Sequence, residues 1–138
     1  MSRIREIKFR AWHKDAKKMV KLGQITLEKG TWNYEPEDRE YIGMSIPYQP
    51  SFIVMKYIGL NDKSGKEIYE GDIVKIDCPT MKMQGKVFYD ENGADFRIYD
   101  ELEDIEECLW YLQEEYEVIG NIYENPELLE KGKEYGKF

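Results

Sequence analysis

One histidine and two cysteines are the side chains of this 138-residue sequence best suited to catalysis or metal binding. His13 and Asp15 form a His-x-Asp pair in a polar stretch, where an imidazole and a carboxylate could act as a general base or hold a metal. No second histidine is present to help coordinate a metal. We therefore expect His13 to be an inert surface residue.

Cys78 and Cys108 lack the close spacing of a zinc or disulfide-exchange motif. A nucleophilic cysteine also needs an activating base, and no pattern in the sequence places His13 near either thiol. We expect two separate reduced thiols rather than a structural disulfide. Since no phosphate-binding loop is present either, the sequence predicts no enzyme activity, no metal and no cofactor.

Glu70 and Asp72 flank Gly71, immediately before the β-branched segment 73–76. Two nearby carboxylates can divide acid and base roles in a hydrolase, but acidic residues are abundant here and many pairs could be nominated. Next to a turn, short acidic side chains more often accept hydrogen bonds from backbone amides. We expect that role, keep Glu70 and Asp72 as candidate interaction residues, and expect Gly71 to take a positive φ.

Cationic side chains gather beside a tryptophan near the start of the chain. The group comprises Lys8, Arg10, Lys14, Lys17, Lys18 and Lys21, with Trp12. This composition suits contacts to phosphates combined with base stacking. However, the isoelectric point near 4.8 opposes nucleic acid at long range, so we expect a solvated hairpin or a contact between subunits. The candidate interaction residues in this group are Lys8, Arg10, Trp12, Lys17 and Lys18.

Charge is segregated along the chain, whose net charge is −8. Residues 1–30 contain nine Lys or Arg and three acids, whereas residues 100–130 contain twelve acids and no Lys or Arg. Opposite charges in one short chain favour an interaction between the two segments, within the chain or between subunits. We expect them to meet across a subunit boundary; the alternative is that both are solvated faces.

Length and composition indicate one ordinary domain or two tightly joined subdomains. Hydrophobic residues make up 41% of the chain and aromatic residues 14%, which is typical of a globular protein. No apolar run approaches the ~20 residues of a membrane-spanning helix, and the basic N-terminus lacks the apolar core of a secretory signal. We expect a cytoplasmic protein with no membrane partner.

Hydrophobic periodicity predicts a mostly β chain, because apolar and polar residues alternate, or β-branched residues cluster, in most segments. Strands are predicted at 5–12, 19–27, 39–43, 52–60, 73–76, 85–89, 96–99 and 116–123. Asn92-Gly93 predicts a hairpin turn, since both residues tolerate positive φ. Gly23 is a candidate β-bulge.

Two helices are predicted near the C-terminus. Apolar residues recur every three or four positions over 101–115, and Asp100 can cap that helix. Its apolar side, expected to contribute to a subunit interface, comprises Leu102, Ile105, Leu109 and Leu112. Asn125-Pro126 predicts the start of a short second helix that ends at Leu129, and 131–138 is expected to be a mobile tail.

Three blocks of sequence resemble a known family. They are REIKFRAW at 5–12, YIGLNDKSGKEIYEGDIVKID at 57–77 and YEVIGNIYENPELL at 116–129. Their content and order resemble the YopX family of phage and prophage proteins, although His13 stands where members usually carry aspartate. The family has no established activity, so the resemblance implies a phage or prophage product with a β-rich, self-associating fold and brings no active site.

These observations predict an α+β, mostly β fold with an SH3-like barrel over 55–130, an N-terminal β subdomain over 1–54 and the inserted helix. The barrel assignment is a fold-level analogy from the Gly71-Asp72 pair that precedes a strand. The predicted function is a non-catalytic, self-associating accessory protein, whose further partner would be an unidentified phage or host protein. The alternative is a nucleic-acid-binding protein that uses the hairpin at 8–21.

Overall fold

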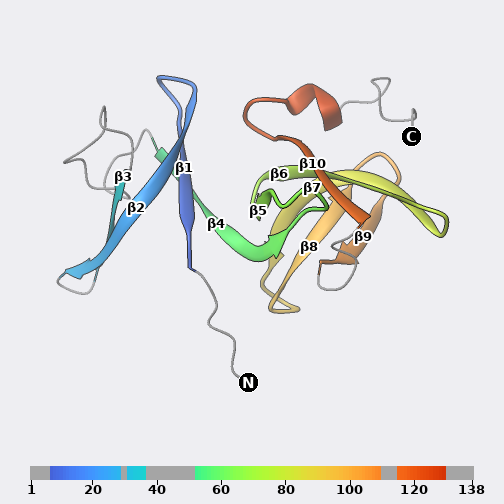
Figure 1. Ribbon diagram of the computed structural model, residues 1–138, viewed down its shortest axis with the longest axis horizontal. Helices are drawn as coiled ribbons and strands as arrows, with labels where there is room; N and C mark the ends of the chain where they lie inside the picture. The colour runs from blue at the N-terminus through green and yellow to red at the C-terminus, as the bar shows by residue number, and fades with distance from the viewer. Residues whose placement is uncertain (1–6, 29–30, 37–51, 110–114, 130–138) are drawn as a thin grey trace. The chain divides into compact units, whose positions relative to one another are not determined.

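The computed structural model describes residues 7–28, 31–36, 52–109 and 115–129, with the backbone alone for 23–28 and 31–36. Antiparallel strands dominate these residues, which confirms the prediction of a mostly β protein. The chain divides into two compact units, residues 1–57 and 58–138, whose strands are labelled in Figure 1. Within the described stretches, no helix is long and apolar enough to cross a bilayer.

The first unit is an antiparallel sheet built on a hairpin. Its strands are β1 (Phe9–His13), β2 (Lys18–Glu28), β3 (Thr31–Pro36) and the first part of β4 (Phe52–Asn61), which continues into the second unit. β1 pairs with both β2 and β4, so alternate side chains from the three strands form one small core: Ala11, Val20, Leu22 and Phe52. The register of β2 against β3 shifts between Leu22 and Gln24, which confirms the bulge predicted at Gly23.

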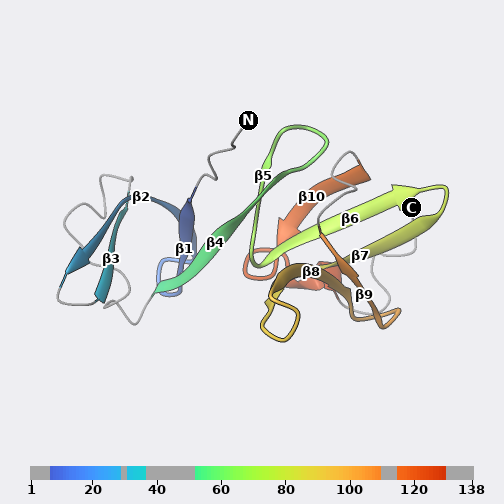
Figure 2. The ribbon, with the colours of Figure 1, turned by 90° about the horizontal axis from the view of Figure 1, so that it is seen from below.

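The second unit contains a five-stranded antiparallel sheet in the order β10-β6-β7-β8-β9, which curves into a half-barrel (Figure 2). The five strands are β6 (Asp72–Cys78), β7 (Met81–Asp90), β8 (Asp95–Asp100), β9 (Ile105–Cys108) and β10 (Tyr116–Asn121). The short strand β5 (Glu67–Tyr69) pairs with β4 in the other sheet. The core comprises Ile68, Val74, Ile76, Met83, Val87, Ile98, Leu109 and Tyr116. The barrel that was predicted as SH3-like is thus observed as an antiparallel half-barrel.

The helix predicted over 101–115 is wrong in the part of it that the structure describes. Residues 101–104 form a turn, and β9 follows and pairs with β8. The expected apolar helix face is therefore dispersed: Leu109 is buried in its own unit, whereas Ile105 is 40% exposed. Leu112 lies outside the described residues.

The failed helix has a local cause and a long-range cause. Asp100 accepts the amides of Leu102 and Glu103, as an N-cap would, but Asp104 then takes φ = +54° and reverses the chain. Acidic residues at helical spacing over 103–107 also repel one another in a helix. Pairing with β8 satisfies the backbone of β9 instead, and local periodicity does not report such pairing.

The short helix predicted after Asn125 is a single 3-10 turn, η3 (Pro126–Leu129), and not an α-helix. The Leu128 amide donates to the Asn125 carbonyl at 3.1 Å, which closes one three-residue turn. From β7, the buried Gln84 side chain donates to the Leu128 carbonyl at 3.0 Å. This bond ties the C-terminal turn to the sheet.

Four shorter segments also differ from expectation. The β7–β8 hairpin is present, but its loop spans 91–94 and the positive φ is at Ala94. Residues 81–84, which lie outside the predicted strands, belong to β7, which begins at Met81. β3 and β5 have no counterpart among the predicted strands, while the strand expected at 39–43 and the tail at 131–138 lie outside the described residues.

Candidate interaction surface

Gly71 anchors the tight turn between β5 and β6. It is buried with φ = +87°, which confirms the predicted positive φ. Its N–H donates to the Val87 carbonyl at 2.9 Å, and its carbonyl accepts the Ile122 amide at 2.8 Å. The turn therefore connects β7 with the chain after β10 through backbone alone.

Asp72 and Glu70, the two carboxylates beside this glycine, have different surroundings. Asp72 is 1% exposed, and its carboxylate accepts the Tyr69 amide at 2.8 Å. This contact closes the turn that Gly71 permits, so Asp72 performs a backbone-binding role. Glu70 is half-buried in the same turn.

Asp62 holds a second turn against β10. One of its carboxylate oxygens accepts the amides of Ser64 and Lys66, and the other accepts the Val118 amide, each at 2.9 Å. Burial alone would raise the pKa of Asp62, but the three amides outweigh burial and hold that pKa below its ordinary value. The Lys63 amide also donates to the Tyr116 carbonyl, so the turn covers an edge of β10.

Asn121 organises the last of the family-like blocks. Its side-chain oxygen accepts the backbone amides of Tyr123 and Glu124 at 3.0 and 2.8 Å. The backbone amide of Asn121 donates to the side-chain oxygen of Asn125. A Cβ at Gly120 would lie 2.5 Å from the Asn125 side-chain oxygen, so this asparagine pair packs tightly on a glycine. The block builds the turn that leads into η3.

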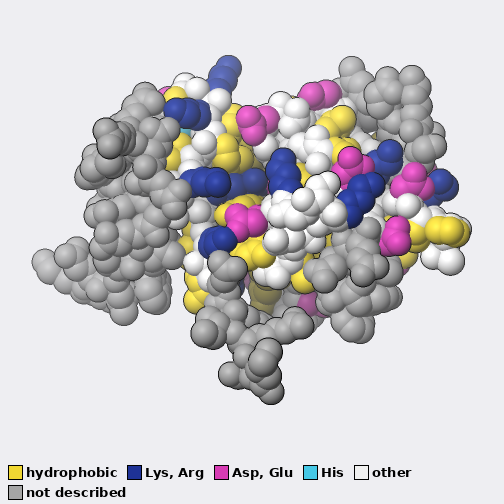
Figure 3. Space-filling model, in the orientation of Figure 1, with side chains coloured by type: hydrophobic (Ala, Val, Ile, Leu, Met, Phe, Trp, Pro, Cys, Tyr) yellow, Lys and Arg dark blue, Asp and Glu magenta, His cyan; other side chains and the backbone are white. Residues whose placement is uncertain are grey.

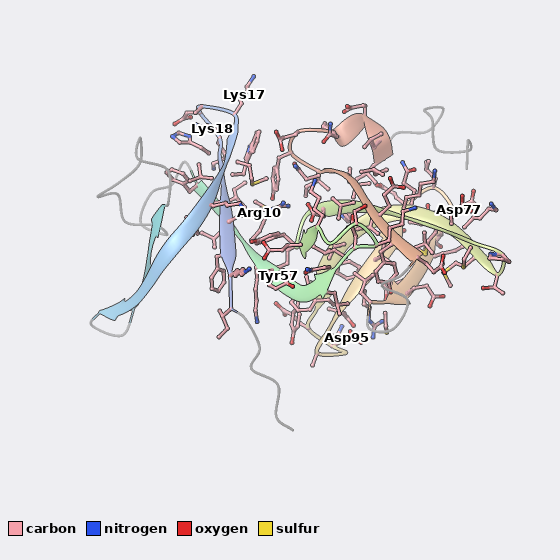
Figure 4. All side chains as sticks on the ribbon, viewed as in Figure 1. Arg10, Lys17, Lys18, Tyr57, Asp77 and Asp95 are labelled. Atoms are coloured by element: carbon pink, nitrogen blue, oxygen red, sulfur yellow. The ribbon has the colours of Figure 1, made fainter. Side chains whose placement is uncertain are left out.

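The basic group predicted near the N-terminus lies along the β1–β2 hairpin. Opposite pairs in the register are Arg10 with Lys21, nearer the middle, and His13 with Lys18, at the end. We call residues 14–18 the hairpin tip; Lys17 and Lys18 lie there, away from Arg10 (Figure 4). The structure therefore separates the predicted group into a tip and a pair of cations on the strands.

Trp12 is only 9% exposed, so its ring is not available to stack on a base. Lys8 lies with its ammonium 5.5 Å from the centre of the Tyr57 ring, within the range of a cation–π contact. Two of the five predicted interaction residues in this group therefore contribute to the packing of the first unit.

His13 has a structural role at the base of the tip. Its Nδ1 accepts the Ala16 amide at 3.2 Å, and its ring lies 4.5 Å from the Phe52 ring, centroid to centroid. Among the described residues, no group of three or more histidine, cysteine or acidic side chains is arranged to hold a metal.

Both cysteines are free thiols in the second unit. Cys78 lies 3.5 Å from the Thr80 hydroxyl, and Cys108 donates to Asp95 at 3.3 Å. The hydrogen bond to the Asp95 carboxylate, together with burial, raises the pKa of the Cys108 thiol. That shift makes Cys108 a weaker nucleophile at neutral pH.

Arg97 is the centre of an ionic cluster that sequence reasoning missed. Its guanidinium contacts Asp95 at 2.8 Å, Glu106 at 2.7 Å and Asp90 at 3.3 Å. The hydrogen bonds to Asp95 and Glu106 raise the already high pKa of Arg97 further. Because Asp90 ends β7, Asp95 begins β8 and Glu106 lies in β9, the cluster fastens these three strands together. The sequence could have revealed the cluster only if the pairing of these strands had been known.

These features define a class of protein: a small two-unit antiparallel β protein whose buried polar side chains hold backbone turns. A family model described as YopX protein matches residues 8–130, and the chain belongs to the YopX family. None of the curated proteins compared with the chain matches it. The family predicted from the three sequence blocks is therefore confirmed.

Two solved structures are similar to this chain. Protein EF1440 from Enterococcus faecalis is 28% identical, with a TM-score of 0.57, over 91% of this chain and 99% of that one. Protein YopX from Bacillus subtilis is 21% identical, with a TM-score of 0.61, over 89% of this chain and 98% of that one. The second likeness concerns the fold alone.

Proposed function

We propose that this protein is a non-catalytic, self-associating interaction module encoded by a phage or prophage and acting in the cytoplasm. The observation that carries the proposal is the division of charge between the two units. Residues 1–57 contain eleven Lys or Arg and seven acids, a net +4, whereas residues 58–138 contain nine and twenty-one, a net −12. Each copy thus offers both partners of an electrostatic contact.

The role of the buried polar side chains supports a non-catalytic function. Asp62, Asp72, Asp100 and Asn121 are each at most 7% exposed, and each accepts at least one backbone amide. The first, second and fourth of these lie in the family-like blocks. Those blocks therefore encode turns of the fold, and an interaction surface must be sought among exposed residues.

Acidic and basic side chains lie intermixed on the second unit in the face shown in Figure 3, so its surface is not uniformly acidic. Individual exposed ion pairs contribute less than ~1 kcal/mol, so an electrostatic contact needs several of them. Large exposed hydrophobic side chains, which could add apolar area to a contact, are Ile7, Tyr89 and Ile105 among the described residues.

Light scattering of the full chain across a salt series tests the proposal. A charge-assisted oligomer should dissociate as the Debye length falls from ~10 Å at about 0.1 M salt to ~3 Å at about 1 M. Reversal of Arg3, Arg5 and Lys8 to Glu should have the same effect at low salt. A monomeric mass at every salt concentration would contradict self-association, and an oligomer indifferent to salt and to reversal would remove charge as its cause.

Nucleic-acid binding is the second candidate, favoured by the exposed lysines of the hairpin tip. Fluorescence anisotropy with labelled single- and double-stranded oligonucleotides at ~50 mM salt tests it, because phosphate contacts produce a steep salt dependence. Binding that is lost when Lys17 and Lys18 become Glu, in a variant with a native circular dichroism spectrum, would favour this candidate over the first.

A further inference from the structure

We propose that the hairpin tip, residues 14–18, docks on the acidic second unit of another copy of this chain. The inference rests on the self-association proposed above and specifies the surface that makes the contact. It gives the tip one occupant, a carboxylate-rich protein surface, in place of the nucleic acid of the second candidate function.

The tip presents its cations from a fixed turn. Lys14, Lys17 and Lys18 are exposed, and Lys17 has φ = +53°, which reverses the chain between β1 and β2. The bond from the Ala16 amide to His13, and the contact of the His13 ring with the core, attach the turn to the sheet. A preorganised turn loses less conformational entropy when it docks than a flexible loop would.

Two lysines of the tip have no ionic partner among the described residues. No described acid forms an ion pair with Lys14 or Lys17. Arg97 in the second unit is the opposite case, since three carboxylates contact it. Lys14 and Lys17 can therefore pair with carboxylates of another copy.

A second copy fits this surface better than a nucleic acid does. The buried Trp12 cannot supply the base stacking that a single-stranded nucleic acid would use. The second unit of another copy carries −12 and is always present in equal amount. Within it, Glu101 and Glu103 are exposed in the turn before Ile105, and no described cation pairs with either.

Complementary charge exchange in the full chain tests the docking. One variant carries Lys14→Glu and Lys17→Glu; the other carries Glu101→Lys and Glu103→Lys. All four side chains are exposed, so both variants should keep the wild-type melting temperature. Each variant alone should associate about tenfold more weakly than the wild type at ~0.1 M salt, because exposed pairs worth under ~1 kcal/mol each are reversed. An equimolar mixture should recover association by sedimentation velocity.

The outcomes separate this inference from the proposed function. A wild-type chain that stays monomeric contradicts both. Wild-type oligomers with variants that associate equally well contradict the docking alone, as does a mixture that fails to recover association. A matched Lys21→Glu variant, with its charge reversed on the strand and outside the tip, should weaken association less than Lys17→Glu. Equal weakening by the two would show that net charge, and not the tip, is responsible.

Discussion

At Gly71 the backbone takes a conformation that a side chain resists, in the interior of the second unit. Gly71→Val should cost about 1–3 kcal/mol of unfolding free energy from the strained φ alone. Gly65→Val is the matched control for burial, since Gly65 shares the strained φ, at +86°, but is exposed, with no atom within 4 Å of an added Cβ. The two variants share the cost of the strained φ, and only Gly71→Val also places a side chain in the interior. Urea unfolding should show a larger loss for Gly71→Val, and a Gly71→Val protein that unfolds with the wild type would contradict the assigned turn.

Asp62 should make the stability of the fold depend on acid. Its pKa in the folded chain lies below the ordinary value of about 3.9, so the folded state binds fewer protons than the unfolded state. The stabilisation is therefore present above about pH 4 and is lost as the pH falls below it. Urea unfolding at about pH 6 and about pH 3 should give a smaller difference for Asp62→Asn than for the wild type.

Asp77→Asn is the control for this pH dependence. Asp77 pairs with Lys82 at 2.7 Å, but both side chains are about half exposed. Both are therefore more open to solvent than the buried Asp62. The exposed pair should contribute little at any pH. If Asp77→Asn flattened the acid dependence as much as Asp62→Asn does, the three-amide contact would not be its source.

Sequence reasoning at single residues worked best where one local rule decides the conformation. The positive φ of Gly71 and the bulge at Gly23 followed from glycine and its neighbours. Asp100 shows the limit, because its side chain binds the two amides expected of an N-cap while the chain beyond it forms a turn. The contact of Asp62 with Val118 was missed since the two residues lie far apart in sequence.

At the scale of elements, Arg97 should determine whether β9 stays paired with β8. Arg97→Leu leaves Asp90, Asp95 and Glu106 without their shared cation, so their mutual repulsion should loosen the strand. Hydrogen exchange followed by mass spectrometry should show faster exchange over Ile105–Cys108 in this variant. Lys82→Leu, which removes one exposed ion pair between β6 and β7, should leave that segment unchanged.

Unaltered exchange of β9 in Arg97→Leu would mean that backbone pairing alone holds the strand.

β9 is also the element for which sequence reasoning failed, because Leu102, Ile105 and Leu109 recur at helical spacing. Its strand conformation depends on partners in β8 that no local pattern reports. β4 and β6, long and rich in β-branched residues, were predicted correctly from their own composition.

For the whole molecule, the three family-like blocks and the surface charges have separate roles in our account. The blocks supply turn residues such as Gly71, Asp62 and Asn121, whose polar groups are used by the fold. The distribution of charge between residues 1–57 and 58–138 supplies the proposed interaction. The sequence was sufficient to predict the family and the charge asymmetry, but it could not show which lysines stand on an exposed turn.

Sedimentation equilibrium of the full chain at ~0.1 M salt tests the central claim, self-association, most directly. We predict a mass that is a multiple of 16.5 kDa and that falls toward 16.5 kDa on dilution or at about 1 M salt. A mass of 16.5 kDa at every protein concentration in low salt would contradict it.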